Sequence, residues 1–150
     1  YGVWPSEDAR RALGGKVTLK PALSWKSIIA EIKTIPKGSM IGYDLTEKVT
    51  RDTRIGIVPV GYWHGYPRSL SGKGEVLVRG KRARVLGRVC MDMIIVDLTD
   101  IPQMKVGDEA VLIGRSGKEE VTADEVAKLS GSSSYEVLTR LNPLMRRIYQ

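Results

Sequence analysis

The chain has 150 residues, enough for a single domain that buries roughly 68–70% of the surface its unfolded form would expose. Hydrophobic residues make up 42% and charged residues 27%, and no apolar run approaches the ~18 residues of a membrane span, so we expect a soluble protein. A single cysteine, Cys90, excludes an internal disulfide framework, and a reducing cytoplasm is the expected compartment.

The net charge of +7 and the pI near 9.6 raise the possibility of a nucleic-acid partner. The densest basic cluster centres on Gly80 between two apolar runs, which is typical of the solvated tip of a β-hairpin. No aromatic side chain interleaves with these charges to stack on bases, so the hairpin interpretation is favoured over a nucleic-acid patch. The cluster consists of Arg79, Lys81, Arg82 and Arg84.

The first part of the chain gives mixed signals. Residues 1–17 read as an entry loop and a short helix that ends at Gly14 and Gly15, and we expect them to connect a preceding part to a domain over residues 18–150. From 19 to 35 the apolar residues fit a helical period better than a strand period, so periodicity alone favours a helix.

β signals dominate from residue 39 to residue 118. They predict strands over 39–43 and over 53–61, where Pro59 must occupy a position that needs no ladder donor. Residues 75–79 and 83–89 form the arms of the predicted hairpin, and another apolar strand covers 91–98. A turn at 106–109 leads into a strand over 110–114, and a second hairpin turn covers 115–118.

Two helices are predicted near the C-terminus. Thr122 with Glu125, and Ser133 with Glu136, have the spacing of a capping box, each ahead of an apolar run. Gly131 and a proline at 143 supply the stops, and residues 144–149 return to an extended strand. The expected fold is therefore mainly β, a small barrel or sandwich-like domain with two short helices near its C-terminus.

The sequence is poor in residues that form familiar catalytic or metal sites. His64 is the only histidine, so neither a paired-histidine metal site nor a Ser-His-Asp triad is expected, and we predict no metal. His64 is interpreted as a structural or surface residue. Cys90 lies in an apolar run, where a thiol behaves as a small hydrophobic group rather than as a nucleophile.

Several motifs stand out in a fixed order along the chain. They are Ile-Gly-Tyr at 41–43, Pro-Val-Gly-Tyr at 59–62 with Gly65 and Arg68 close behind, Gly-Arg-Val-Cys-Met-Asp at 87–92 and Ser-Tyr-Glu-Val at 134–137. In this order and at this spacing the chain resembles the C-terminal domain of alanine racemases. The stretches at 1–6 and 20–26 also resemble that family, and the resemblance implies that residues 19–35 form a bulged strand rather than a helix.

The resemblance implies racemisation of alanine with pyridoxal phosphate, in which two protein groups serve the two faces of the α-carbon. One is a lysine of a separate (β/α)₈ barrel, and nothing in this chain resembles that cofactor-lysine motif. The other is a tyrosine, matched here by Tyr43. Because a free phenol has a pKa of about 10, its action as a base near neutrality requires neighbouring positive charge or hydrogen bonds.

The resemblance also assigns residues around the substrate. Met91 matches a position that lines the substrate pocket, where an apolar side chain favours alanine over serine. Tyr135 matches a residue whose hydroxyl contacts the cofactor phosphate. The remaining matches are Cys90, Asp92 and Tyr62 for substrate binding, and Arg68 and Arg88 for the entry corridor, where cations would attract a carboxylate.

Two positions depart from the family pattern, namely Trp63-His64, where Ala-Asp is common, and Arg146, where a proline is usual. The family places one subunit's β domain over the other subunit's barrel in a homodimer, so we expect Tyr43 to act in the partner's site and the isolated domain to be inactive. The alternatives are a basic β module that binds RNA or another polyanion, and a serine-preferring relative of the racemase.

Overall fold

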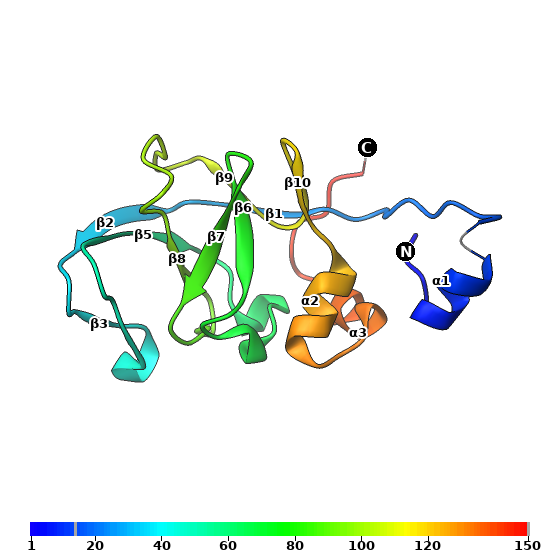
Figure 1. Cartoon of the computed structure of the whole chain (residues 1–150), viewed down its shortest axis with the longest axis horizontal. Coiled ribbons are helices and arrows are strands. Elements are labelled where there is room, and N and C mark those ends of the chain that lie inside the picture. The colour runs from blue at the N-terminus through cyan, green and yellow to red at the C-terminus, as the bar shows by residue number, and fades with distance from the viewer. Residues whose placement is uncertain (14, 150) are drawn as a thin grey trace.

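The computed structural model describes residues 1–13 and 15–149, and the predicted helix stop at Gly14 lies outside the described residues. Its elements run from the N-terminal helix through the strands to two C-terminal helices (Figure 1). The helices are α1 (Glu7–Leu13), α2 (Ala123–Ser130) and α3 (Ser134–Thr139), with 3₁₀ turns η1 (Tyr43–Leu45), η2 (Tyr62–His64) and η3 (Arg68–Leu70). The strands are β1 (Trp25–Ile28), β2 (Glu31–Ile35), β3 (Met40–Ile41), β4 (Glu47–Lys48), β5 (Thr53–Val58), β6 (Glu75–Val78), β7 (Lys81–Leu86), β8 (Ile94–Asp97), β9 (Glu109–Ser116) and β10 (Glu119–Val121).

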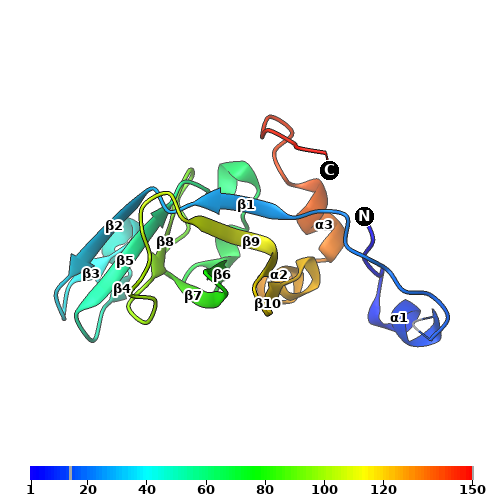
Figure 2. The ribbon, with the colours of Figure 1, turned by 90° about the horizontal axis from the view of Figure 1, so that it is seen from above.

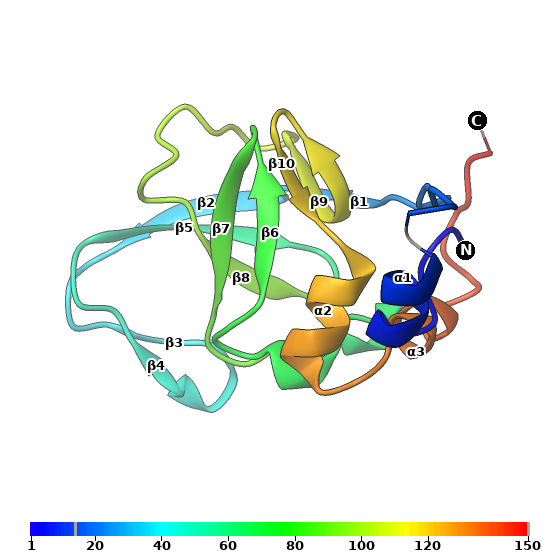
Figure 3. The ribbon, with the colours of Figure 1, turned by 45° about the vertical axis from the view of Figure 1, so that its right-hand side comes forward.

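One antiparallel sheet forms the body, in the order β1-β9-β6-β7-β8-β5-β2, with β10 paired to β9. β1 and β2 follow one another in sequence but lie at opposite ends of this order. The chain bends between them, where Ile29 N–H donates to Asp108 O and Ala30 N–H to Ile57 O, both at 2.8 Å. The sheet therefore closes on itself through one bent segment, as a small barrel does. β1 lies alongside β9 in Figure 2, and β6 and β7 cross in front of β2 and β5 in Figure 3.

The interior of the sheet is filled by aliphatic side chains such as Val76, Val85, Ile94 and Leu112, all fully buried. A second, smaller cluster comprises Ile41, Val49, Ile55 and Leu86. This second cluster lies where the β3-β4 hairpin meets the sheet, and Ile41 is the hairpin's own contribution to it. It thus anchors the hairpin that carries Tyr43.

The segment 19–35 contains β1 and β2 and no helix, so the helical periodicity was misleading there; the bulged strand implied by the family is confirmed from Trp25 onward, and residues 19–24 form no strand. The pairing register shifts between Trp25 and Lys26, which marks the bulge, and the bend at 29–30 separates β1 from β2. The bulge and the bend each shift the alternation of apolar and polar residues by one position, which moves the apolar residues to the other face of the strand. Two such shifts over a short stretch give a spacing that resembles a helical period.

Apart from the C-terminal stretch, the remaining strand and helix predictions are confirmed except at their limits. The Arg79-Gly80 turn has φ values of 48° and 73°, as a two-residue hairpin turn between antiparallel strands requires. Pro59 directly follows β5, outside the ladder. Thr122 Oγ1 accepts from Glu125 N–H at 3.0 Å at the start of α2. Both C-terminal helices pack at one end of the sheet (Figure 1).

The predicted strand over 144–149 is wrong. This stretch has no strand residue in the described part of the chain, and Leu144, Ile148 and Tyr149 are 80%, 72% and 91% exposed. A strand forms only where a second strand lies alongside to accept and donate its backbone hydrogen bonds. The local sequence of 144–149 carries no information on whether such a strand is present. Among the described residues no helix is long and apolar enough to cross a membrane.

Candidate functional site

Tyr43 lies at the tip of the β3-β4 hairpin, in the single turn η1, and its side chain is 62% exposed. The predicted strand over 39–43 ends at Ile41 because Gly42 turns the chain with a φ of 82°. Asp44 and Leu45 follow with φ values of 60° and 50°, a conformation that side chains with a Cβ rarely adopt. A strained turn thus presents the phenol outward instead of packing it inside the module.

A direct backbone contact sets this hairpin against the loop after β7. A Cβ added to Gly42 would lie 3.0 Å from Gly87 Cα, and a Cβ on Gly87 would lie 3.0 Å from Gly42 Cα. No side chain fits between the two loops. Arg88, the next residue, forms an ion pair with Asp44, the residue after Tyr43. The fold therefore brings the phenol and the Arg88 guanidinium onto neighbouring loops.

Backbone hydrogen bonds hold the turn that contains Tyr62 against the loop that follows β7. Tyr62 N–H donates to Cys90 O at 3.0 Å, and Trp63 N–H donates to Met91 O at 2.9 Å. A Cβ on Gly61 would lie only 2.2 Å from Cys90 O, so glycine is required for this approach. The side chains of Tyr62 and Met91 are 46% and 54% exposed, which leaves them free to line a pocket completed by another surface.

The neighbouring predicted residues are placed by the same loops. Cys90 is half-buried with its Sγ 3.7 Å from Arg88 O, and Asp92 is exposed in the turn before β8. Arg68 is exposed at the start of η3, and its carbonyl accepts from Ser71 Oγ at 2.6 Å. Ser71 Oγ in turn accepts from Val89 N–H at 3.0 Å, which ties the Arg68 turn to the Arg88 loop.

Tyr135 lies in the first turn of α3 and is 39% exposed. Ser133 Oγ accepts from Glu136 N–H at 3.2 Å, so the interpretation of Ser133 as a capping residue is confirmed. The Tyr135 ring packs edge-on against Tyr1, with centroids 6.1 Å apart. Within residues 1–13 and 15–149 no hydrogen bond is found for the Tyr135 hydroxyl.

The segment after α3 contacts the Tyr62 turn. Asn142 N–H donates to His64 O, and its Nδ2 donates to Trp63 O, both at 3.1 Å. His64 Nδ1 accepts from Gly61 N–H at 3.1 Å, a contact in keeping with the expected structural or surface role. These contacts fix the segment after α3 to the Tyr62 turn. Most of the predicted site residues lie in turns and loops between strands, and Tyr135 lies in α3, which is on the lower side of the ribbon in Figure 1, as is the end of the β3-β4 hairpin.

Comparison with known proteins identifies the family to which this fold belongs. Residues 22–149 match the family model described as alanine racemase, C-terminal domain. The chain belongs to this family. An alanine racemase of Methylacidiphilum infernorum is 48% identical over 150 residues, and one of Halothermothrix orenii is 43% identical, each covering all of this chain. The chain spans 37% and 38% of the length of these two relatives.

Solved structures agree with this assignment. The alanine racemase of E. faecalis superposes over the whole chain with a TM-score of 0.91 at 37% identity, and the chain covers 39% of it. That of Bacillus anthracis with bound L-Ala-P gives a TM-score of 0.87 at 40% identity over 95% of the chain and 36% of that structure. The mainly β fold with two short C-terminal helices is therefore that of an alanine racemase C-terminal domain.

The basic hairpin of this alanine racemase domain is internally neutralised. Arg79 pairs with Asp108, Arg84 pairs with Glu47, and Lys81 donates to a backbone carbonyl at 3.2 Å. Arg82 contacts three carboxylates, those of Glu75, Glu119 and Glu125. Its hydrogen bond to Glu125 is the largest of several contacts that raise its pKa further above the ordinary value. Cations so engaged do not form an open phosphate-binding surface, and the polyanion alternative is not favoured.

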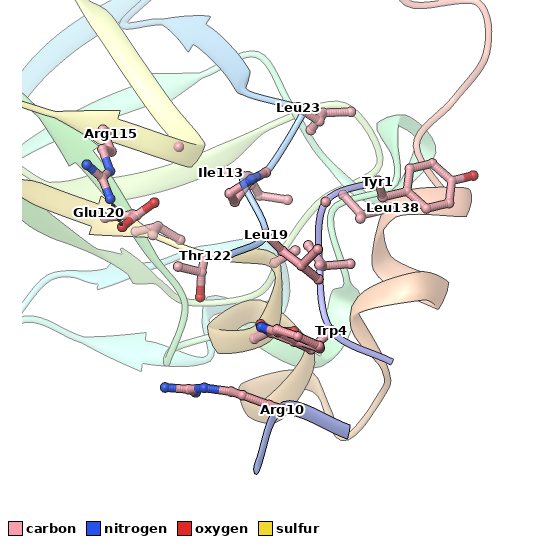
Figure 4. A pocket seen from close by; sticks show the side chains of 17 residues that line it. Tyr1, Trp4, Arg10, Leu19, Leu23, Ile113, Arg115, Glu120, Thr122 and Leu138 are labelled. Atoms are coloured by element: carbon pink, nitrogen blue, oxygen red, sulfur yellow. Dashed lines mark ion pairs between the residues drawn. The ribbon is translucent and has the colours of Figure 1, made fainter. Parts of the chain in front are cut away.

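A cavity of about 270 Å³ lies away from these loops, between the N-terminal stretch and the β9-β10-α2 end of this racemase domain (Figure 4). Its labelled walls include Trp4 and Arg10 on one side and Ile113 and Leu138 on the other. None of the predicted site residues lines it. No group of three or more His, Cys, Asp or Glu side chains suited to a metal is found in the described part of the domain.

Sequence reasoning missed two carboxylates that shape the loops of this racemase domain. Asp44 and Glu47 carry no motif, and their partners Arg88 and Arg84 are about 40 residues away along the chain. The only available signal was that Asp44 directly follows the predicted site residue Tyr43.

Proposed function

We propose that this chain is the C-terminal part of a pyridoxal-phosphate-dependent alanine racemase that interconverts L- and D-alanine, and that residues 1–17 connect it to a cofactor-binding barrel. The observation that carries the proposal is a phenol, Tyr43, held outward by a strained turn beside the Arg88 loop in a domain of the racemase family. Residues 18–150 then form the β domain. The single cysteine is consistent with action in a reducing cytoplasm.

Tyr43 is proposed to exchange a proton with the substrate α-carbon through its phenolic oxygen. The groups that make this phenol an effective base are proposed to come mainly from the barrel. Within this chain the Arg88 guanidinium is paired with the Asp44 carboxylate. The chain therefore supplies an acid-base group, held next to an ion pair on the neighbouring loop.

Substrate selection is assigned to the loops that pack on Met91. Its exposed thioether would contact the methyl group of alanine, and a hydroxymethyl group would find no polar partner there. Cys90, Asp92 and Tyr62 would complete this wall, while Arg68 and Arg88 would draw in the substrate carboxylate.

The residues present fit one contact to pyridoxal phosphate, namely the exposed Tyr135 hydroxyl, which would donate a hydrogen bond to the phosphate. When bound, the cofactor supplies an electron sink for the α-carbon. The rest of its site belongs to the barrel, because this chain has no cofactor-lysine motif.

A homodimer is proposed because of the aromatic and methionine side chains on the site loops. Monomeric proteins rarely leave many large apolar side chains exposed together. The partner's barrel would cover them and receive Tyr43 in its own active site. They include Met40, Tyr43, Leu45, Tyr62, Trp63, Met91 and Met93, each between 39% and 62% exposed.

The decisive test uses the full-length protein that carries this chain, assayed by circular dichroism of alanine solutions. Tyr43→Phe is expected to lower kcat about 10²–10⁴-fold, because a general base is removed. The matched control is Tyr149→Phe, in the C-terminal tail, with kcat within twofold of the parent. A parent that turns over serine faster than alanine would identify the serine-preferring relative instead. Turnover by the 150-residue chain alone would refute the division of labour.

Complementation tests whether Tyr43 acts in the partner's site. Subunits with Tyr43→Phe are mixed with subunits that lack the barrel's cofactor lysine, and the dimers are allowed to re-form. If the tyrosine acts in trans, each heterodimer regains one complete site and the mixture recovers about a quarter of the parent activity. If it acts within its own subunit, no site is restored.

A further inference from the structure

The β3-β4 hairpin that carries Tyr43 has little regular structure of its own. Its strands pair through two residue pairs, and an isolated two-stranded hairpin is at best marginally stable in water. Its turn contains Asp44 and Leu45 at positive φ, and such positions persist only where the surroundings hold them. Apolar packing is provided by Ile41 in β3 and by Val49, directly after β4. Polar contacts on the strand opposite Ile41 complete the attachment of the hairpin.

Glu47, in β4, makes the polar contacts that do this. One carboxylate oxygen accepts from Gly87 N–H and the other from the Arg84 guanidinium. The Glu47 side chain is 19% exposed, so these contacts are shielded from water more than a surface ion pair would be. Hydrogen bonds to a carboxylate are among the stronger ones in proteins.

Two further contacts close a ring around this carboxylate. Arg84 Nη1 donates to Gly72 O at 3.0 Å, and Gly72 N–H donates to Gly87 O at 2.9 Å. Glu47, Arg84, Gly72 and Gly87 are thus joined in one circuit. A hollow of about 260 Å³ borders Glu47, Arg84 and Leu86, so apolar side chains do not fill the space beside this circuit.

The circuit lies next to the residues that matter for the proposed reaction. Gly87 touches Gly42 backbone to backbone, Gly42 directly precedes Tyr43, and Arg88 directly follows Gly87. A displacement of Gly87 relative to the hairpin would therefore shift the phenol and the guanidinium together.

We infer that Glu47 is a positioning residue for Tyr43, its carboxylate clamping the Tyr43 hairpin to the Gly87 loop. The inference rests on the proposed racemase function. Glu47 exchanges no proton with the substrate and acts through the placement of the phenol.

The first experiment measures Glu47→Ala and Glu47→Gln in the full-length racemase. Glu47→Ala is expected to lower kcat about 10–100-fold with KM for alanine within about threefold, because a misplacement of the order of 1 Å can cost 10²-fold. Glu47→Gln should lose less, since its amide oxygen still accepts from Gly87 N–H while its amide nitrogen faces Arg84. The matched control is Glu31→Gln, whose carboxylate pairs with Lys33 on exposed β2.

A second readout separates positioning from a purely structural role. With alanine deuterated at the α-carbon, proton transfer at the Tyr43 face becomes more rate-limiting in Glu47→Ala. The kinetic isotope effect therefore rises for the enantiomer whose proton the phenol removes, and rises less for the other. Full kcat in folded Glu47→Ala, or a loss of kcat with unchanged isotope effects and reduced cofactor content, would overturn the inference.

Hydrogen exchange on the 150-residue chain tests the clamp independently of catalysis. Glu47→Ala should speed exchange at the Gly87 amide and across residues 40–48, with the β5-β8 ladder unchanged. Unchanged exchange at Gly87 would refute the clamp. If the parent enzyme fails to racemise alanine while the Gly87 amide responds as expected, the proposed function fails and the clamp stands.

Discussion

Replacement of Arg82 by methionine tests how the helical end of the domain is joined to its sheet. The Arg82 guanidinium lies 2.7 Å from Glu75, 3.1 Å from Glu119 and 2.5 Å from Glu125, and it donates to Glu120 O at 2.7 Å. It therefore connects β7 with β6, β10 and α2. Arg82→Met removes every one of these contacts and leaves three carboxylates facing one another.

The expected loss follows from the partial exposure of the cluster. The Arg82 side chain is 33% exposed, and each such ion pair contributes between 0.2 and 1 kcal/mol, roughly, when screened by water. Arg82→Met loses three ion pairs and one hydrogen bond to the backbone but gains from burying the methionine. We expect the free energy of unfolding to fall by about 2 kcal/mol. For a domain of this size that loss corresponds to a decrease in Tm of about 4–8 °C.

Urea unfolding followed by circular dichroism measures this difference in the free energy of unfolding. The matched control is Arg115→Met, because Arg115 is 77% exposed and has one carboxylate partner, Glu120, at 3.1 Å. We expect the control to lose less than about 0.5 kcal/mol. The difference in free energy of unfolding between Arg82→Met and Arg115→Met should decrease in 1 M salt, because salt screens the ion pairs that Arg82 makes. Equal losses for both variants at low salt would refute the reasoning.

Three further predictions concern single contacts. Tyr66→Phe should raise the free energy of unfolding by about 1 kcal/mol, because the Tyr66 hydroxyl is buried without a partner in the described residues; a lower urea midpoint would contradict this. Gly61→Ala should cost about 1–3 kcal/mol, since the new Cβ would meet Cys90 O at 2.2 Å, and an unchanged near-ultraviolet spectrum and urea midpoint would show that the loop yields freely. The hydrogen bond from Arg79 lowers the pKa of Asp108 below the ordinary 3.8, so its contribution to stability is present above pH 3.8 and is lost as pH falls through the lower folded value. Asp108→Asn should remove that part of the acid dependence, measured as urea midpoints between pH 7 and pH 2, and an unchanged profile would argue against it.

Most of the fold could be predicted because its signals are local. The Arg79-Gly80 turn and the caps at Thr122 and Ser133 each depend on residues a few positions apart, and each is present where expected. The bend at 29–30 could not be predicted from period alone, because β1 and β2 each pair with strands far away in sequence. Family resemblance supplied what periodicity lacked.

The site was predictable to a different extent. The motif residues were singled out because each motif combines glycine with an aromatic or charged neighbour, as Gly42-Tyr43 does, and the structure places this turn against the Gly87-Arg88 loop. The polar contacts that hold those loops were not found. A glutamate such as Glu47 has no distinguishing sequence neighbour, and its importance comes from Arg84 and Gly87, which only the folded chain brings to it.

The bent segment from Trp25 to Ile35 supplies both terminal strands of the sheet, which has a consequence for synthesis. During synthesis on the ribosome, β2 can pair as soon as its partner β5 has emerged. β1 must wait until its partner β9 emerges much later. During that interval the apolar side chains of Trp25 and Ile28 have no ladder to join. A nascent chain arrested before residue 109 should therefore be a ready substrate for chaperones and a poor candidate for spontaneous folding.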